Sequence, residues 1–344
     1  MTPRIIVDDN IPFIKGRLEP FAEVVYADQF GFPPSIVADA DAMIIRTRTR
    51  CNEALLRDSK VRFIATATIG MDQFDLPWCR QAGIECRNSP GCNAPGVAQY
   101  VWSALLRSGF DPSRHTLGVV GHGNVGSIVA GWGRMLGAEV LVSDPPKAED
   151  GTLICDDTPL DDLLRRSDAV TLHTPLVRTG AHPTFHLIGE RELEIMRPGA
   201  ILVNAARGPV ADNQALLRAV TSGDIRAIID TWEGEPRLDT RLLEKVEIGT
   251  FHIAGYSLEG KQRATRMVLE AAGEWFGFSP DISGLAPAWR EPLSIDPAEI
   301  LRSYNPLDDT APLKADPAAF DILRANYRFR KEPDFRRQGS DIRF

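Results

Sequence analysis

Short apolar segments alternate with amphipathic segments along most of the chain. The first series of apolar segments consists of "RIIVDD" (4–9), "EVVYAD" (23–28), "AMIIRT" (42–47), "VRFIATAT" (61–68) and "GIECRN" (83–88). Short runs rich in Val and Ile, separated by enough chain for a crossover, are typical of buried parallel strands. The next segment, "APGVAQYVWSALLR" (94–107), has the pattern of a helix. We therefore predict a parallel α/β domain at the start of the chain.

A second series of apolar segments begins after this helix. Its members are "TLGVVG" (116–121), "EVLVSD" (139–144), "DAVTLHT" (168–174), "AILVNAA" (200–206), "RAIIDT" (226–231) and "VEIGTFHI" (246–253). This is a βαβ series in its own right, which predicts a second α/β domain. A long amphipathic segment, 258–277, predicts a helix that leaves the series, whereas the chain from about residue 285 is Pro-rich and lacks a clear period.

These patterns predict two α/β domains followed by a third element. Residues 285–344 form a small third element, which carries the basic cluster "FDILRANYRFRKEPDFRR". The tail positions Phe320, Ile322, Leu323, Tyr327 and Phe329 are apolar and have no obvious partner within two complete α/β domains. We therefore expect a homodimer held by residues after about 285.

Composition excludes several classes of protein. Of 344 residues, 43% are hydrophobic and 25% are charged, as in soluble globular proteins, and the net charge of −8 argues against nucleic acid or anionic membrane as a partner. The five cysteines follow no metal-ligand spacing, so we expect reduced thiols and no metal. The N-terminus lacks the pattern of a signal peptide, and no apolar run approaches the roughly 20 residues that span a bilayer. We expect a cytoplasmic protein.

The segment "GVVGHGNVGSIVAGWGRMLGAEVLVSD" (118–144) carries the most specific motif. Gly121, Gly123 and Gly126 follow a predicted strand and open a predicted helix, and Asp144 ends the next strand. This context is that of the dinucleotide-binding fingerprint, in which the glycines allow a tight turn, close approach of the pyrophosphate and close helix packing. The amides of Asn124 and Val125 would face the phosphates. Asp144 would bind the ribose hydroxyls and repel a 2′-phosphate, which favours NAD over NADP.

Oxidation of an alcohol by a nicotinamide cofactor requires a proton acceptor and a cation that orients the substrate. Arg207, Glu235 and His252 each follow a predicted strand of the second series, where α/β proteins place such groups. His173 also lies at a strand end and is the alternative base. We favour His252, because a carboxylate at the neighbouring strand end could hold its other ring nitrogen.

The segments "NAARGPVADNQAL", "DTWEGEP" and "GTFHIAGYSLEGK" around these three residues resemble the D-isomer-specific 2-hydroxyacid dehydrogenases. "GCNAPGVAQYV", "FIATATIGMDQFD" and "VSDPP" resemble the branch of that family that acts on a phosphorylated hydroxyacid in vitamin B6 synthesis. The resemblance covers roughly residues 1–280, and the tail is similar to part of a C-terminal dimerisation domain. It implies a Rossmann-type NAD-binding domain (94–254) inserted in a flavodoxin-like substrate-binding domain (1–93 and 255–284), with NAD as cofactor.

The same resemblance implies roles for individual residues. It assigns catalysis to Arg207, Glu235 and His252, with His252 as the proton donor in the reductive direction. It assigns contacts with the cofactor to Asn124, Val125, Asp144, Thr174, Ala205, Ala206, Arg207, Asp230 and Gly255, and contacts with the substrate to Thr47, Thr68 and Tyr256.

Several alternatives remain open at the level of the sequence. Arg207 could bind only cofactor phosphate, Glu235 could pair with a surface arginine, and Tyr256 could be a core aromatic residue. In "RTRTR" (46–50), alternation places Arg46 nearest a cleft, where it would bind a substrate phosphate, but the run could also be a solvated surface segment. Two other functions remain possible for the whole chain. It could be another D-2-hydroxyacid dehydrogenase, such as one acting on 3-phosphoglycerate, or an NAD-sensing binding protein.

Overall fold

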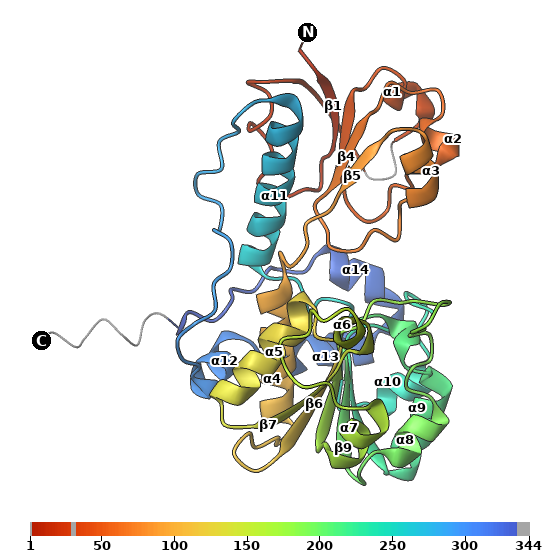
Figure 1. The fold of residues 1–344 in the computed structure, drawn as a ribbon, viewed down its shortest axis with the longest axis vertical. Coiled ribbons are helices and arrows are strands. Elements are labelled where there is room, and N and C mark those ends of the chain that lie inside the picture. Colours follow the sequence, from red (N-terminus) through yellow and green to blue (C-terminus); the bar gives the residue numbers. More distant parts are fainter. Residues whose placement is uncertain (1, 29–31, 336–344) are drawn as a thin grey trace, which may run out of the picture. The chain divides into compact units, whose positions relative to one another are not determined.

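The computed structural model describes residues 2–28 and 32–335, which fold into two compact units (Figure 1). The first unit comprises the chain up to Asn93 together with Ser257–Trp289, and the second comprises Ala94–Tyr256 together with the chain from Arg290. Arg336 and Arg337 of the basic cluster, and the end of the expected C-terminal element, lie outside the described residues.

The first unit contains a parallel five-stranded sheet in the order β2-β1-β3-β4-β5. Its elements are β1 (Arg4–Asp8), β2 (Glu23–Ala27), α1 (Pro34–Val37), β3 (Ala42–Ile45), α2 (Glu53–Leu56), β4 (Phe63–Thr66), α3 (Leu76–Gln81), β5 (Glu85–Arg87) and α11 (Leu258–Phe276). This strand order is that of the flavodoxin-like fold, as expected.

Both faces of the first sheet are buried at its inner strands β1, β3 and β4, which explains why these strands are almost continuously apolar. Ile5 and Val7 of β1 pack with residues of α11 such as Val268, whereas Ile6 between them packs on the opposite face with residues such as Val37 and Leu56. Successive side chains of a strand point to opposite faces, so one apolar run supplies two separate cores. The helix predicted over 258–277 is confirmed as α11, and it covers the sheet formed by the N-terminal part of the chain (Figure 1).

The second unit contains a parallel six-stranded sheet in the order β11-β10-β9-β8-β6-β7. Its strands are β6 (Thr116–Val120), β7 (Glu139–Ser143), β8 (Ala169–Leu172), β9 (Ala200–Asn204), β10 (Ile225–Ile229) and β11 (Ile248–Gly249). Its helices are α4 (Ala94–Arg107), α5 (Asn124–Met135), α6 (Pro145–Glu149), α7 (Leu160–Arg166), α8 (Glu190–Ile195), η1 (Gly208–Val210), α9 (Asn213–Ser222), α10 (Thr240–Lys245), α12 (Pro297–Ser303), α13 (Leu307–Ala315), η2 (Pro317–Ala319) and α14 (Phe320–Ala325). The predicted α/β class is thus confirmed for both sheets, and the helix predicted over 94–107 is α4.

The topology fixes where ligands can bind in each unit. The strand order reverses between β1 and β3 in the first sheet, and between β6 and β8 in the second. In open α/β sheets, ligands bind beyond the carboxyl ends of the strands at such switch points.

The C-terminal segment differs from the sequence-based expectation. It forms the helices α12, α13 and α14, and Leu313 and Phe320 are completely buried in the core of the second unit, with Leu323 and Tyr327 packed against it. The expectation that the tail's apolar residues lack partners in their own chain was therefore wrong for most of them. Ile322 alone among these side chains is largely exposed, at 65%.

The strand predicted over residues 246–253 is shorter in the structure. β11 ends at Gly249, and the segment that continues to His252 is a loop. The alternation of apolar residues continues past the strand because Phe251 and Ile253 are buried in the same core without pairing to β10. His252 therefore lies on a loop rather than at the end of a strand.

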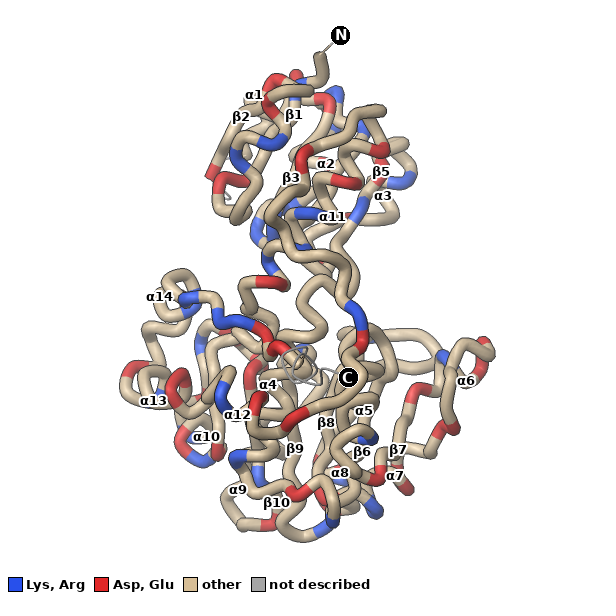
Figure 2. The backbone as a smooth tube through the Cα atoms, turned by 90° about the vertical axis from the view of Figure 1, so that its left-hand side faces the viewer, with Lys and Arg blue, Asp and Glu red and all other residues tan. Residues whose placement is uncertain are grey.

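The distribution of charged residues and the apolar character of the helices are consistent with the amino-acid composition. Acidic and basic residues are interspersed along the backbone of both units (Figure 2). No helix among the described residues has both the length and the apolar character that a bilayer crossing demands.

Candidate functional site

The glycine loop after β6 lies at the switch point of the second sheet. A Cβ atom added to Gly121 would lie 2.9 Å from the backbone carbonyl of His173, in the segment that follows β8, and Gly121 has a positive φ of 89°. A Cβ atom on Gly126 would lie 1.8 Å from the oxygen of Gly121. These two glycines are required by the backbone of the folded chain itself.

Gly123 differs from its two neighbours in the motif. A Cβ atom added there meets nothing within 4 Å, so the space beside it is open. Gly123 is also the N-cap of α5 and has no side chain that could bond the first amides of this helix, which include those of Asn124 and Val125. Open space in front of uncapped amides at a helix N-terminus is the arrangement that accepts a phosphate group.

Asp144 follows β7, next to this loop. One of its carboxylate oxygens accepts a hydrogen bond from the backbone N–H of His122 at 2.7 Å, and the other accepts one from Lys147 at 3.2 Å. The carboxylate is thereby fixed beside the glycine loop, where it could accept hydrogen bonds from ribose hydroxyls. The hydroxyl of Thr174, after β8, is buried and has no hydrogen-bond partner among the described residues, so it is a candidate donor to a bound molecule.

His252 and Glu235 are in direct contact. Nδ1 of His252 lies 2.6 Å from Oε1 of Glu235, and Oε2 of Glu235 accepts the backbone N–H of Trp232 at 3.2 Å. With Nδ1 occupied in this way, Nε2 is the ring nitrogen that can exchange a proton with a substrate. Burial acts to raise the pKa of Glu235, but the hydrogen bond and the charge of His252 lower it by more, so the pKa of this carboxyl group lies below its usual value.

The backbone of His252 adopts the left-handed conformation, with a φ of 59°. For a residue with a Cβ atom, this conformation costs about 1–2 kcal/mol and persists only where the surroundings impose it. The buried carboxylate of Asp230, after β10, supplies part of that constraint, since it accepts the N–H groups of Ile253 at 2.8 Å and Ala254 at 3.0 Å. The hydroxyl of Thr250 donates to the same carboxylate at 2.6 Å.

Arg207 follows β9, on the same edge of the sheet. Its guanidinium donates to the carbonyl of Ala206 at 2.9 Å, and its own carbonyl accepts the side-chain amide of Asn204 at 3.0 Å. Asn204 also accepts the N–H of Ala206 at 3.2 Å, so this buried amide shapes the loop that contains Ala205 and Ala206. Sequence reasoning did not select Asn204, although a polar residue that ends an apolar strand was the available signal.

Gly208 brings the loops after β9 and β10 together. A Cβ atom at this position would lie 2.1 Å from both the carbonyl carbon and the oxygen of Trp232, and 2.5 Å from the nitrogen of Glu233. The backbone that carries Arg207 therefore packs directly against the backbone that leads to Glu235. As a result, the cation and the dyad come from loops whose separation is fixed by main-chain contact.

The alternative base, His173, has a different environment. Its Nε2 lies 3.0 Å from the hydroxyl of Thr171, which is not a carboxylate. Burial lowers the pKa of His173 to about 3, so the imidazole is neutral and a poor proton acceptor at neutral pH. The geometry thus favours His252 over His173 as the base.

Gly255 and Tyr256 continue the loop of His252. The ring of Tyr256 makes edge contacts with Tyr327 and Phe329, and the guanidinium of Arg324 lies 5.6 Å from its ring centroid. All three neighbours belong to the C-terminal segment. This segment therefore surrounds a residue expected to bind the substrate, a role that the sequence pattern of the tail did not suggest.

The remaining expected substrate residues lie in the first unit, after adjacent strands. Thr47 follows β3 and Thr68 follows β4, and the hydroxyl of Thr68 lies 2.7 Å from that of Thr66. Nη1 of Arg46 donates to the carbonyl of Asn10 at 3.1 Å. Asn10 follows β1, so Arg46 spans the switch point between β1 and β3.

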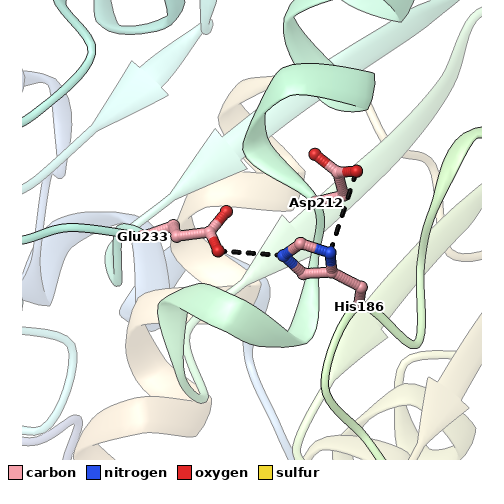
Figure 3. A group of neighbouring side chains, drawn as sticks. All are labelled: His186, Asp212 and Glu233. Carbon is pink, nitrogen blue, oxygen red and sulfur yellow. Dashed lines mark hydrogen bonds and ion pairs between the residues drawn. The ribbon is translucent and has the colours of Figure 1, made fainter.

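One group of three side chains among the described residues has the composition of a metal site (Figure 3). Nε2 of His186 lies 2.9 Å from Oε1 of Glu233, whereas Nδ1 lies 3.8 Å from Oδ2 of Asp212. The two carboxylates contact different nitrogens of one ring, as in a hydrogen-bonded network in which the imidazole bridges two carboxylates. We interpret the cluster as a polar link between three loops of the second unit.

The residues of the second unit fit a dinucleotide. Four features lie around one switch point: the open space at Gly123, the uncapped amides of α5, the fixed carboxylate of Asp144, and the hydroxyl of Thr174, which has no partner among the described residues. The His252–Glu235 dyad lies beyond other strands of the same sheet. Together they define the NAD-binding unit of a dehydrogenase.

Comparison with known proteins gives the family. Residues 93–254 match the NAD-binding domain of the D-isomer specific 2-hydroxyacid dehydrogenases. The chain is 43% identical to the erythronate-4-phosphate dehydrogenase of Bacteroides fragilis over 341 residues, which covers 96% of this chain and 97% of the relative. It is 41% identical to the enzyme of the same name from Escherichia coli K12, over 96% of this chain and 92% of the relative. The chain belongs to the D-isomer-specific 2-hydroxyacid dehydrogenase family and groups there with the erythronate-4-phosphate dehydrogenases.

Solved structures agree with this assignment. The D-lactate dehydrogenase of Aquifex aeolicus, in complex with NAD and lactic acid, is 25% identical and matches with a TM-score of 0.66 over 80% of this chain and 95% of that one. The NAD-bound 3-phosphoglycerate dehydrogenase of Entamoeba histolytica, 23% identical, has the same fold, with a TM-score of 0.67 over 80% of this chain and 96% of that one.

Proposed function

We propose that the protein oxidises 4-phospho-D-erythronate at C2 to 2-oxo-3-hydroxy-4-phosphobutanoate, with NAD as the oxidant, in the biosynthesis of pyridoxal 5′-phosphate. The contact of 2.6 Å between His252 and Glu235 carries the catalytic part of this proposal, because a sensor or a structural protein needs no proton relay. The substrate is proposed from the two erythronate-4-phosphate dehydrogenases that resemble this chain over nearly its full length.

The residues of the second unit would divide the reaction among them. Bound NAD would supply the acceptor for the hydride that leaves C2 of the substrate. Nε2 of His252 takes the proton of the C2 hydroxyl group, and Glu235 stabilises the imidazolium that forms through its bond to Nδ1. Arg207 orients the substrate carboxylate and stabilises the developing carbonyl oxygen. In the reductive direction, His252 returns the proton.

The cofactor contacts follow from the residues already described. Asn124 and Val125 would hold the pyrophosphate, and Asp144 the ribose hydroxyls. Thr174, Ala205, Ala206, Asp230 and Gly255 are the remaining proposed contacts of NAD. Residues 94–254 would accordingly form the NAD-binding domain, and residues 1–93 with 255–284 the substrate-binding domain.

One screen tests the proposed activity. Purified protein and NAD are mixed with 4-phospho-D-erythronate, 3-phosphoglycerate, D-lactate and unphosphorylated D-erythronate, and NADH absorbance is followed. The highest kcat/KM is expected with 4-phospho-D-erythronate. A higher value with 3-phosphoglycerate would favour the rival dehydrogenase, and NAD binding without turnover of any hydroxyacid would favour an NAD-sensing protein.

We further propose that Thr47, Thr68 and Tyr256 contact the substrate and that Arg46 binds its phosphate group. The position of Arg46 across the switch point of the first sheet supports this role, and a guanidinium pairs well with phosphate. Arg46→Ala should raise KM for the phosphorylated substrate by at least about tenfold, the effect of losing roughly 1.4 kcal/mol of binding. It should hardly change activity on D-erythronate.

Arg50→Ala provides a matched control, since Arg50 is an exposed arginine of the same "RTRTR" segment. The control should leave both substrates unaffected. Equal losses with phosphorylated and unphosphorylated substrate in Arg46→Ala would mean that the phosphate is held elsewhere.

We also propose a cytoplasmic homodimer held through the C-terminal segment. Ile322 and Leu307 of this segment are 65% and 45% exposed, and Ile322 lines a surface cavity of about 790 Å³ formed largely by the same segment. Light scattering at micromolar concentration should give the mass of a dimer. Ile322→Asp should shift the protein toward monomer, whereas Ile154→Asp, at an exposed isoleucine outside the C-terminal segment, should not. A monomeric wild-type protein would contradict the proposal.

A further inference from the structure

Arg330 of the C-terminal segment is a buried cation whose donors are all engaged. Its Nε donates to the side-chain oxygen of Gln99 at 3.0 Å. Nη1 donates to the carbonyl of Ile253 at 2.9 Å and lies 3.5 Å from that of Tyr256, and Nη2 donates to the carbonyls of Gly96, at 2.9 Å, and of Ala254. The guanidinium is also stacked 4.3 Å from the ring centroid of Tyr304. Only the planar five-donor head of arginine can make this set of contacts.

The contacts of Arg330 complete those of Asp230 on the loop of His252. The N–H groups of Ile253 and Ala254 point to the carboxylate of Asp230, and the carbonyl groups of the same two residues point to the guanidinium of Arg330. The N–H and carbonyl groups of both Ile253 and Ala254 are therefore held between a buried anion and a buried cation. Each charge compensates the burial of the other across two peptide groups.

The contacts of Asp230 and Arg330 lie directly after a residue whose backbone conformation is strained. His252 has a left-handed conformation, and its own N–H donates to the carbonyl of Asp230 at 2.9 Å. The contact of its ring with Glu235 depends on where the Cα atom of His252 lies. A displacement of about 1 Å in such a group can cost roughly a hundredfold in rate.

We propose that Arg330 is a positioning residue for proton transfer: it fixes the carbonyl groups after His252 and thereby holds the imidazole against Glu235 in the reactive geometry. The proposal rests on the proposed dehydrogenase function, because the task of the loop is proton exchange with a substrate hydroxyl group. It assigns the C-terminal segment a part in catalysis within its own subunit, in addition to assembly.

The pKa of Arg330 agrees with a permanent cation in this place. Burial acts to lower it, but the phenolic groups of Tyr304 and Tyr327 and, to a smaller extent, the carboxylate of Asp230 outweigh that effect and keep it above the usual arginine value. The tail also has independent reasons to stay docked, since Leu313 and Phe320 are fully buried in the core. Removal of the guanidinium should therefore perturb the loop without releasing the segment.

The test compares Arg330→Gly and Arg330→Lys with Arg328→Gly, a control at an exposed arginine of the same segment. We expect kcat per NAD-binding site to fall about a hundredfold in Arg330→Gly and at least about tenfold in Arg330→Lys. The Kd for NAD should stay within about threefold of wild type, and Arg328→Gly should match wild type. Millimolar guanidinium ion should restore at least about tenfold of the lost kcat in Arg330→Gly, and none in His252→Ala.

A second readout needs no substrate. The proton in the short hydrogen bond between His252 and Glu235 should give a low-field resonance in the proton NMR spectrum, identified by its loss in His252→Gln. It should be present in Arg328→Gly and shifted or lost in Arg330→Gly. A kcat within about twofold of wild type in both Arg330 variants, or loss of kcat with an unchanged resonance and no rescue, would overturn the proposal.

These readouts separate the proposal from the substrate assignment. If 4-phospho-D-erythronate is the wrong substrate, the wild-type protein already fails to oxidise it, and the variants are then compared on the hydroxyacid that it does oxidise. A failure of the Arg330 proposal appears in the comparison of variants with wild type, either as an unchanged kcat or as a loss of kcat with an unchanged resonance and no rescue.

Discussion

Gly208 provides the sharpest test of how the site is assembled. In Gly208→Ala, the new Cβ atom would lie 2.1 Å from the carbonyl carbon and oxygen of Trp232 and 2.5 Å from the nitrogen of Glu233. Carbon atoms in contact are normally about 3.5–4.0 Å apart, so the two loops must separate by more than about 1 Å. All three atoms belong to the backbone, and no change of rotamer can relieve the clash.

The shift falls between Arg207 and Glu235, so its cost should appear in catalysis. A misplacement of about 1 Å corresponds to a loss of roughly 10² in kcat/KM, and overpacking of this kind typically destabilises a protein by about 1–3 kcal/mol. NAD binding should weaken less than kcat/KM falls, because the glycine loop proposed for the pyrophosphate follows a different strand, β6, and only the contacts after β9 and β10 lie on the displaced loops. Steady-state kinetics by NADH absorbance, titration of NAD and thermal unfolding together measure these three effects.

Gly123→Ala is the matched control, and it should show the opposite pattern. Gly123 has a φ of −80°, and its added Cβ atom meets nothing within 4 Å, so the fold should tolerate alanine. The methyl group would occupy the space proposed for the pyrophosphate, which should weaken NAD binding at least about tenfold, or 1.4 kcal/mol. Gly208→Ala with a kcat within about twofold of wild type would refute the argument that main-chain packing positions the cation against the dyad.

Three further predictions concern single groups. Asp144 should make NADP bind at least about tenfold more weakly than NAD, and equal affinities by titration would remove this role. His252→Ala should lower kcat by roughly 10²–10⁴ with NAD binding retained; near-normal turnover would return His173 to consideration. Because the pKa of Glu235 is depressed in the folded protein, its stabilising contribution is present above the ordinary value of 4.5 and lost as pH falls through the folded value. The difference in unfolding midpoint between wild type and Glu235→Gln should thus be constant near neutral pH and shrink below about pH 4.5; a constant difference down to pH 3 would contradict the shift.

Local features of the sequence were sufficient for the strands and the glycine loop. Short Val- and Ile-rich runs bounded by polar residues favour strands, and every predicted strand has a counterpart in the structure. The spacing of Gly121, Gly123 and Gly126 between a strand and a helix is likewise a local property of the chain. The close contacts that require glycine in this loop are with residues a few positions away in the chain, except for the contact of Gly121 with His173.

The C-terminal segment shows where local patterns stop being informative. Its helices α12–α14 are short, and they form because residues such as Phe320 can enter a core already built by the second sheet. Short helices are marginal by themselves, and tertiary packing supplies most of their stability. The tail's apolar residues could therefore not be assigned to their own core, or to a partner, from sequence alone.

The sequence by itself determined two α/β sheets, a dinucleotide loop and the identities of Arg207, Glu235 and His252 as candidates for chemistry. Only the tertiary structure decided that His252 lies on a left-handed loop, that Gly208 brings two loops into main-chain contact, and that Asp230 and Arg330 hold the loop from opposite sides. The physical reason is the range of the interactions. Hydrophobic periodicity and turn preferences act between near neighbours in the chain, whereas the placement of a buried charge depends on partners supplied by the folded chain, such as the backbone carbonyl groups of Ile253 and Ala254 that face Arg330.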